Sequence, residues 1–250
     1  MKLCTLASGS SGNSLFIETN NSRILVDAGI SYTRIRKRLK SIDVDISDID
    51  AVIITHEHTD HAQAVLQFKQ PVYVANSISN LWRDNPENIK VFDAGKTFVI
   101  NEIAITPFPI PHDAIDPVGF ILKSEGIKIG VVTDIGVNTR LVTERLKGLN
   151  LVIIEYNHDD RMLIDSNYPW HLKQRIKSRL GHLSNGEASS LLNSILHDDL
   201  DSVILAHLSK INNSPQRAFE SASSVLCNTG YRNIKINVAP RDKIGDIIEL

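Results

Sequence analysis

Short apolar runs rich in β-branched residues recur along the chain, with turn residues between them. Runs of roughly four to eight such residues are typical of β-strands. We expect strands over residues 14–18, 23–26, 51–54, 72–75, 103–106, 118–122, 128–132, 151–154, 202–206, 234–238 and 247–249.

Helical patterns separate some of these strands. The clearest covers 214–227, where Ser214 can cap the free N–H groups, Pro215 suits the first helical position and Gly230 lies just past the end. Further helices are predicted over 32–39, 60–68 and 187–196.

The strands outnumber what one doubly wound parallel sheet needs, and the helices come singly between groups of strands. This inventory favours an α+β fold, an αββα four-layer sandwich of two sheets packed face to face with helices outside. The 250 residues are 42% hydrophobic, enough for a substantial core. Without a low-complexity linker or a short-period repeat, we expect residues 1–250 to form one domain.

Composition restricts location and partners. No apolar run approaches the roughly 18 residues that span a bilayer, and the apolar start is too short for a signal-peptide core, so we expect a cytoplasmic protein without a membrane partner. The formal net charge of -2 argues against nucleic-acid binding by bulk charge alone. Two basic clusters could face phosphates, although solvated helix faces are the favoured interpretation: Arg34, Arg36, Lys37, Arg38 and Lys40, and Lys173, Arg175, Lys177 and Arg179.

Sulfur chemistry is not expected. Cys4 and Cys227 are the two cysteines, they lie far apart, and neither belongs to a Cys-x-x-Cys pattern. We expect both to be buried free thiols.

Four potential metal ligands follow directly on the predicted strand 51–54. His56 and His58 alternate on an extended loop and can converge on one ion, while Asp60 and His61 begin the next predicted helix and can serve a second. Imidazole and carboxylate ligands suit Zn²⁺, Mn²⁺ or Fe²⁺ and do not decide among them. The sequence therefore predicts a metal site here.

This His-x-His-x-Asp-His segment resembles the signature of the metallo-β-lactamase superfamily, whose fold is the αββα sandwich. The resemblance extends over nearly the whole chain. It implies that Asp27 orders the metal loop without binding metal, and that Asp134 bridges two ions. One ion would be held by His56, His58 and His112, and the other by Asp60, His61 and His207.

The resemblance further implies hydrolysis. Two divalent ions about 4 Å apart lower the pKa of a bridging water, so that a hydroxide between them can act as the nucleophile near neutral pH. Asp134 stands where one class of zinc β-lactamases has cysteine, and His58 stands where the di-iron oxygen reductases have glutamate. Antibiotic hydrolysis and redox chemistry are therefore disfavoured.

A possible acid lies in the second half of the chain. In the tRNA 3′-processing nucleases of the superfamily, a glutamate and a histidine handle the leaving-group proton, and Glu155 and His182 stand in corresponding places. By this analogy Glu155 orients His182, which is the general acid. Alternatively, Glu155 is a surface residue and His182 caps a helix. A catalytic role is thus predicted for Asp60, Glu155 and His182.

The full set of motifs is similar to the bacterial YycJ/WalJ-type proteins, which implies a 5′ to 3′ exonuclease acting on DNA. The motifs cover residues 7–14, 55–61, 111–120, 181–185 and 207–213. Alternatives are a small-molecule phosphodiesterase, a thioester hydrolase of the same superfamily, and a non-catalytic scaffold, against which the intact ligands argue. The oligomeric state stays open.

Overall fold

The computed structural model describes residues 1–82 and 87–250. The chain falls into two compact units. Unit 1 comprises Met1–Pro109, Ala114–Ile127 and Pro240–Leu250, and unit 2 comprises Ile110–Asp113 and Lys128–Ala239. The expectation of a single domain stays a prediction.

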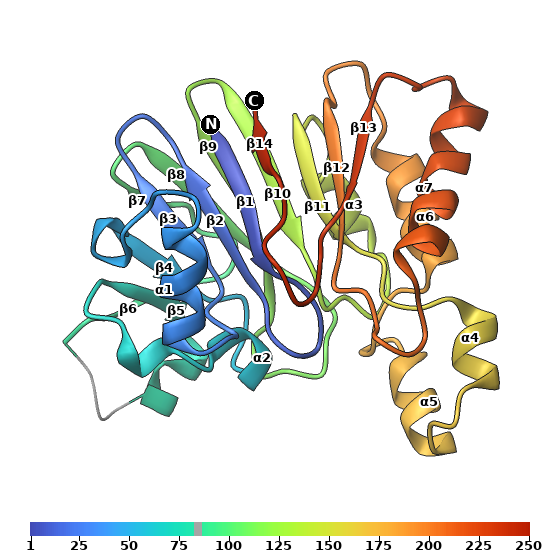
Figure 1. Ribbon diagram of the computed structural model, residues 1–250, viewed down its shortest axis with the longest axis horizontal. Helices are drawn as coiled ribbons and strands as arrows, with labels where there is room; N and C mark the ends of the chain where they lie inside the picture. Colours follow the sequence, from blue (N-terminus) through green and yellow to red (C-terminus); the bar gives the residue numbers. More distant parts are fainter. Residues whose placement is uncertain (83–86) are drawn as a thin grey trace. The chain divides into compact units, whose positions relative to one another are not determined.

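Unit 1 contains a sheet with the strand order β14-β1-β2-β3-β4-β5-β6 (Figure 1). Its first four strands pair antiparallel, and β3 to β6 pair parallel. Three more strands, β7, β8 and β9, pair antiparallel. The strands are β1 (Lys2–Ala7), β2 (Ser14–Glu18), β3 (Arg23–Val26), β4 (Ala51–Ile53), β5 (Val72–Ala75), β6 (Ile89–Phe92), β7 (Phe98–Ile100), β8 (Ile103–Pro109), β9 (Val118–Ser124) and β14 (Ile247–Glu249).

The helices of unit 1 are short. They are α1 (Tyr32–Lys40), α2 (Thr59–Ala62) and the 3₁₀ turns η1 (Ile46–Asp48), η2 (Val65–Gln67) and η3 (Asn76–Trp82). The central strands are apolar on both faces and their side chains are buried, as in Ile24, Leu25, Val52 and Ile53. This core holds the loops that carry the predicted metal ligands.

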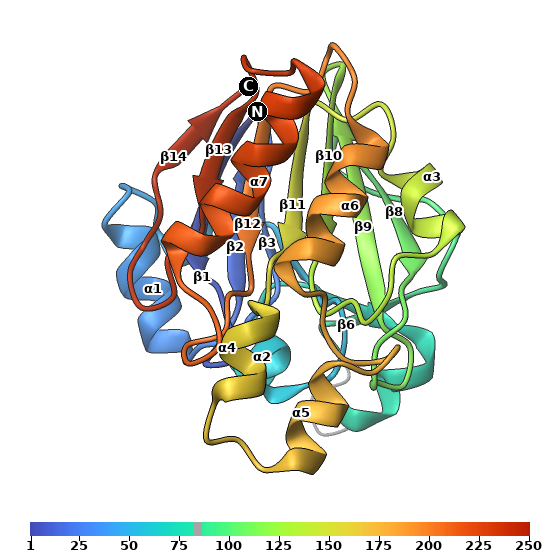
Figure 2. The ribbon, with the colours of Figure 1, turned by 90° about the vertical axis from the view of Figure 1, so that its right-hand side faces the viewer.

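Unit 2 is built on four parallel strands in the order β13-β12-β11-β10. They are β10 (Ile127–Val132), β11 (Leu151–Glu155), β12 (Ser202–Ala206) and β13 (Lys235–Val238). The helices are α3 (Arg140–Arg145), α4 (Asp160–Asp165), α5 (Trp170–Ile176), α6 (Asn185–Ile195) and α7 (Pro215–Thr229). Figure 2 shows α6 and α7 side by side, with α4 and α5 below them.

Helix α7 confirms the predicted capping. The Ser214 Oγ accepts a hydrogen bond from Arg217 N at 3.2 Å, Pro215 is the first helical residue, and Gly230 ends the helix with φ = 86°. The left-handed φ explains a glycine there, because a Cβ disfavours that conformation.

The helix predicted over 60–68 is wrong beyond Ala62. The Asp60 carbonyl, which would accept from Ala64 in a continuing helix, accepts instead from Asn13 N at 2.7 Å. Ala64 N donates to the carbonyl of Ala28 at 2.9 Å. These long-range bonds fold the segment into α2 and η2, and periodicity does not reveal them.

The thiol prediction holds for one cysteine. Cys4 is buried, but Cys227 is exposed. The buried face of α7 carries Ala218, Ala222 and Leu226. The residue after Leu226 is turned by roughly 100° from that face, so Cys227 points to solvent.

Within residues 1–82 and 87–250, no helix is both long enough and apolar enough to cross a bilayer.

Candidate metal-binding residues in the two units

The predicted site residues follow the carboxyl ends of strands. In unit 2, Glu155 ends β11, while Asp134 and His207 follow the neighbouring strands β10 and β12. In unit 1, Asp27 follows β3, and the ligand loop follows its parallel neighbour β4. Because parallel strands end at the same edge of a sheet, these side chains are gathered within each unit.

Three predicted site residues adopt a left-handed backbone. Asp27, Asp134 and His207 have φ values of 65°, 57° and 54°. For a residue with a Cβ this conformation costs about 1–3 kcal/mol and persists where the surroundings enforce it, often at functional sites. Each of the three residues follows the end of a strand. The left-handed backbone there means that the side chain does not continue the alternation between the two faces of the sheet.

Unit 1 brings together His56, His58, Asp60 and His61. Nε2 of His56 lies 3.2 Å from Nδ1 of His58, and the rings of His56 and His61 have centroids 4.1 Å apart. Nε2 of His61 lies 3.7 Å from Oδ2 of Asp60. His56 and His61 are fully buried. These side chains offer nitrogen and oxygen donors in one small volume.

Asp27 contacts the ligand loop as predicted, although its role there stays a prediction. Its Oδ1 accepts from Thr55 N at 2.8 Å, and its Oδ2 lies 2.7 Å from Nδ1 of His61. A ring that donates from Nδ1 presents its lone pair on Nε2, the form a metal ligand needs. Asp27 can therefore set the tautomer of His61.

Sequence reasoning missed the role of Asn13. Its Nδ2 lies 2.9 Å from Nε2 of His61 and donates to the Asp60 carbonyl at 3.2 Å. Asn13 precedes β2 in the glycine- and serine-rich segment, and no ligand-like spacing marked it. Gly29 permits this close packing, because a Cβ there would fall 1.6 Å from the Asp60 carbonyl oxygen.

Unit 2 gathers three histidines around Asp134. Its Oδ1 lies 3.9 Å from Nε2 of His112, 3.7 Å from Nδ1 of His182 and 3.4 Å from Nδ1 of His207. Asp134, His112 and His207 are buried, and the His182 side chain is 19% exposed. Three members of the cluster are therefore shielded from solvent, and His182 is the member that solvent or a substrate can contact.

Glu155 is positioned to orient the two histidines next to it. Its Oε1 lies 2.9 Å from Nδ1 of His182 and 2.8 Å from Nδ1 of His207. Its Oε2 accepts from Ile135 N and Leu183 N, each at 3.1 Å. Asp134, Glu155, His182 and His207 together could also be a metal set. With both oxygens facing two donors each, however, Glu155 is better suited to orient these rings than to bind an ion.

Local charge shifts the pKa values of the histidines in opposite directions. Burial disfavours protonated His182, but the charge of Glu155 and its hydrogen bond outweigh burial and raise the pKa of His182 above 6.5. Burial lowers the pKa of His112, and the charge of Asp134 only partly opposes it. The lowered pKa favours the neutral imidazole of His112, which is the form that binds metal.

His158, the alternative acid, is poorly placed. Its side chain is 1% exposed, and burial lowers its pKa. A general acid must reach the substrate. His182 is the better candidate, and its buried partner Glu155 is not the surface residue of the alternative interpretation.

The donors in both units fit divalent ions. They comprise imidazole nitrogens and carboxylate oxygens, and Cys4 and Cys227 take no part in either cluster. Such a set suits Zn²⁺, Mn²⁺ or Fe²⁺. Further carboxylates, Asp27 and Glu155, hold the non-ligating nitrogens of His61 and His207, an arrangement that metal-binding histidines commonly have.

The comparison with known proteins agrees with this chemistry. The beta-lactamase superfamily domain matches residues 22–207. The chain therefore belongs to the beta-lactamase superfamily, and it is a metal-dependent hydrolase. The predicted α+β fold class is confirmed, with two sheets flanked by helices in the described residues.

Within the superfamily, the chain is similar to two named nucleases, which confirms the resemblance to the YycJ/WalJ type. It is 33% identical over 235 residues to exodeoxyribonuclease YycJ of Bacillus anthracis, covering 90% of this chain and 89% of the relative. It is 35% identical over 232 residues to exodeoxyribonuclease WalJ of Streptococcus pneumoniae, covering 87% and 85%. The fold matches the metallo-beta-lactamase fold protein YhfI of Bacillus subtilis with a TM-score of 0.76 at 16% identity, over 100% of this chain and 99% of that one.

Proposed function

We propose that this enzyme hydrolyses phosphodiester bonds of DNA, as an exonuclease with 5′ to 3′ polarity, in the cytoplasm. The observation that carries the proposal is the pairing of His182 with Glu155 beside Asp134 and His207. An oriented imidazole next to metal ligands suits an ester whose leaving group needs a proton. The similarity to YycJ and WalJ over most of the chain supports DNA as the substrate.

Seven residues would hold two divalent ions of Zn²⁺, Mn²⁺ or Fe²⁺. When bound, the ions acidify water and polarise the scissile phosphate. The assignment rests on the family resemblance and is supported by the internal geometry of each unit. The proposed ligands are His56, His58, Asp60, His61, His112, Asp134 and His207.

The chain's own residues would manage the leaving group. Water adds to phosphorus and releases a proton to solvent as the bond to the leaving oxygen breaks, and His182 donates its Nε2 proton to that oxygen and then regains one from solvent. The Nδ1 proton stays between His182 and Glu155, which holds the ring in place. Deoxyribose alkoxide is a poor leaving group without this proton, so a positioned acid contributes about 10²–10⁴-fold to the rate.

A thioester hydrolase has less need of His182, because a thiolate leaves without protonation. A small-molecule phosphodiesterase would use the same residues and is the second candidate. No feature of the described residues favours it over DNA.

A substrate screen tests the proposal. The chelator-treated enzyme is reconstituted with Zn²⁺, Mn²⁺ or Fe²⁺ and given end-labelled single- and double-stranded DNA, a small cyclic phosphodiester and a thioester. We expect cleavage of DNA from one end with at least one metal and little turnover of the others. Preferential hydrolysis of the small ester or the thioester would reject a DNA substrate.

A further inference from the structure

The segment from Asp159 to Leu180, here called the α4–α5 arm, presents an exposed aromatic ring. Trp170 begins α5 and is 69% exposed, the largest exposed fraction among the large apolar side chains of the described residues. Trp82, the other tryptophan, is 9% exposed. An exposed tryptophan forgoes the free energy gained by burying its large apolar ring. Such exposed aromatic rings are typical of binding surfaces.

The second part of this arm, from Trp170 onward, concentrates positive charge. Residues 170–180 contain no aspartate or glutamate and four cations, Lys173, Arg175, Lys177 and Arg179. Against a formal net charge of -2 for the whole chain, this run is a local exception. Phosphate groups are attracted by such a local cluster.

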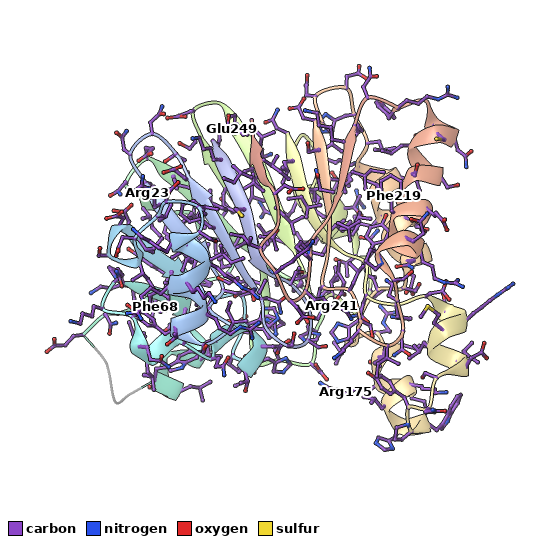
Figure 3. The ribbon with its side chains drawn as sticks, viewed as in Figure 1. Arg23, Phe68, Arg175, Phe219, Arg241 and Glu249 are labelled. Carbon is purple, nitrogen blue, oxygen red and sulfur yellow. The ribbon has the colours of Figure 1, made fainter. Side chains whose placement is uncertain are left out.

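Part of this charge fixes the arm in place. Arg175 Nε donates to Asp113 Oδ2 at 2.6 Å, Lys177 Nζ to Asp160 Oδ1 at 2.8 Å and Lys173 Nζ to the Ser166 carbonyl at 2.7 Å. Arg179 is exposed and forms no ion pair within residues 1–82 and 87–250. Figure 3 labels Arg175 on the arm and Phe219 on α7.

The arm is joined directly to the site residues of unit 2. The Ile176 carbonyl accepts from His182 N at 2.9 Å, and the Leu180 carbonyl accepts from Asp113 N at 3.0 Å. Nδ1 of His112 lies 3.2 Å from the Gly181 carbonyl. The arm therefore precedes His182 in the chain and is hydrogen-bonded to it, so a ligand bound on the arm would lie near this residue.

We propose that the α4–α5 arm binds single-stranded DNA, with a base stacked on Trp170 and a phosphate held by Arg179. This inference rests on the proposed function and adds a substrate-binding surface to it. An exposed aromatic ring interleaved with cations is the combination by which proteins bind single strands without base-specific contacts. A protein partner would also use Ile164 and Leu180, which are 56% and 50% exposed, but the four cations of residues 170–180 favour phosphates, and the three aspartates of the arm all precede Trp170.

Tryptophan fluorescence tests the arm directly. In a Trp82→Phe protein, Trp170 is the sole tryptophan, and after chelation of metals the protein can be titrated with oligothymidylate without cleavage. We expect quenching that weakens as salt is raised. Arg179→Ala should bind several-fold more weakly.

The tryptophan itself is tested in the protein that retains Trp82. Trp170→Ala should bind labelled oligothymidylate roughly tenfold more weakly and raise KM for DNA by a similar factor in the active enzyme. The matched control is Phe219→Ala, which removes an aromatic ring that is 41% exposed on α7 and should bind as the parent does.

The outcomes separate this inference from the proposed function. DNA-dependent quenching in an enzyme that hydrolyses no DNA would support the arm and reject the function. DNA hydrolysis with unchanged affinity and KM in both Trp170→Ala and Arg179→Ala would reject the arm and retain the function. Quenching by single-stranded RNA alone, or by phosphatidylglycerol vesicles and not by DNA, would overturn DNA as the occupant.

Discussion

Glu155 and His182 form a carboxylate–imidazole pair in which Glu155 is buried and His182 is partly exposed, with Oε1 2.9 Å from Nδ1. The pair joins the end of β11 to the residue that follows the α4–α5 arm and Gly181. The hydrogen bond fixes the ring orientation of His182, whose side chain is 19% exposed. The proposed proton transfer depends on this relationship.

Glu155→Gln should reduce both turnover and stability. One oxygen of the carboxylate accepts from two backbone N–H groups, and the other faces two imidazoles. In glutamine an NH₂ group replaces one of these oxygens, so a donor would face donors and their hydrogen bonds would be lost. We expect a loss of about 1–3 kcal/mol in the free energy of unfolding, measured in urea, and a smaller loss of turnover than in His182→Ala. Glu187→Gln, at an exposed glutamate of the α6 capping box, is the control; a Glu155→Gln protein as stable and active as this control would contradict the role of Glu155.

Metal content should be two divalent ions per chain. Seven donors exceed what one four-coordinate ion uses. Asp134→Ala should lose metal together with activity, whereas Asp93→Ala, at a half-exposed carboxylate paired with Lys96, should lose neither. Elemental analysis of the loaded proteins measures this, and one ion per fully loaded chain would reject the two-ion assignment.

Gly29→Ala should disrupt the ligand loop of unit 1. The added Cβ would lie 1.6 Å from the Asp60 carbonyl oxygen, so the backbone at Asp60 would have to move. We expect a loss of about 3 kcal/mol or more in stability and a loss of metal. The control is Gly186→Ala on α6, where the nearest atom would be 3.9 Å away and where alanine favours the helix. Equal stability of the two variants would contradict the close packing.

The two thiols should react very differently. Cys227 is exposed, whereas burial, followed by the charge of Asp246, raises the pKa of Cys4 to about 11. At pH 9 only about 1% of Cys4 is thiolate, so one thiol per chain should react quickly with a disulfide reagent in the native protein, and two after unfolding. Because the folded pKa of Cys4 lies above its ordinary value of 9.0, this thiol costs stability as pH rises from about 9 towards 11. Two fast native thiols would contradict the burial of Cys4.

The strands and the ligand loop are predictable from sequence because they depend on local patterns. Apolar β-branched runs mark β3, β4, β10, β11 and β12, and His56 to His61 stand directly after one of them. The backbone at Asp27, Asp134 and His207 is not marked by any pattern, since a left-handed turn at a non-glycine residue is imposed by the surrounding fold.

Contacts between distant segments account for what the sequence did not predict. The side chain of Asn13 contacts His61, which is 48 positions further along the chain. The backbone N–H of Asn13 also donates to the Asp60 carbonyl, which would otherwise accept within a longer helix. The basic cluster at 173–179 is a solvated helix face by pattern alone. Its attachment to His182 and the exposure of Trp170 become visible only in the folded chain.

The most direct test of the account measures how the defect of His182→Ala depends on the leaving group. On DNA, the variant should keep its metal content and lose about 10²–10⁴-fold in turnover, because the leaving alkoxide needs a proton. On bis(p-nitrophenyl) phosphate, whose leaving group needs none, the loss should be much smaller. An equal loss on both substrates, or a variant that drops a metal ion, would contradict the assignment of His182 as the acid of a metal-dependent DNA hydrolase.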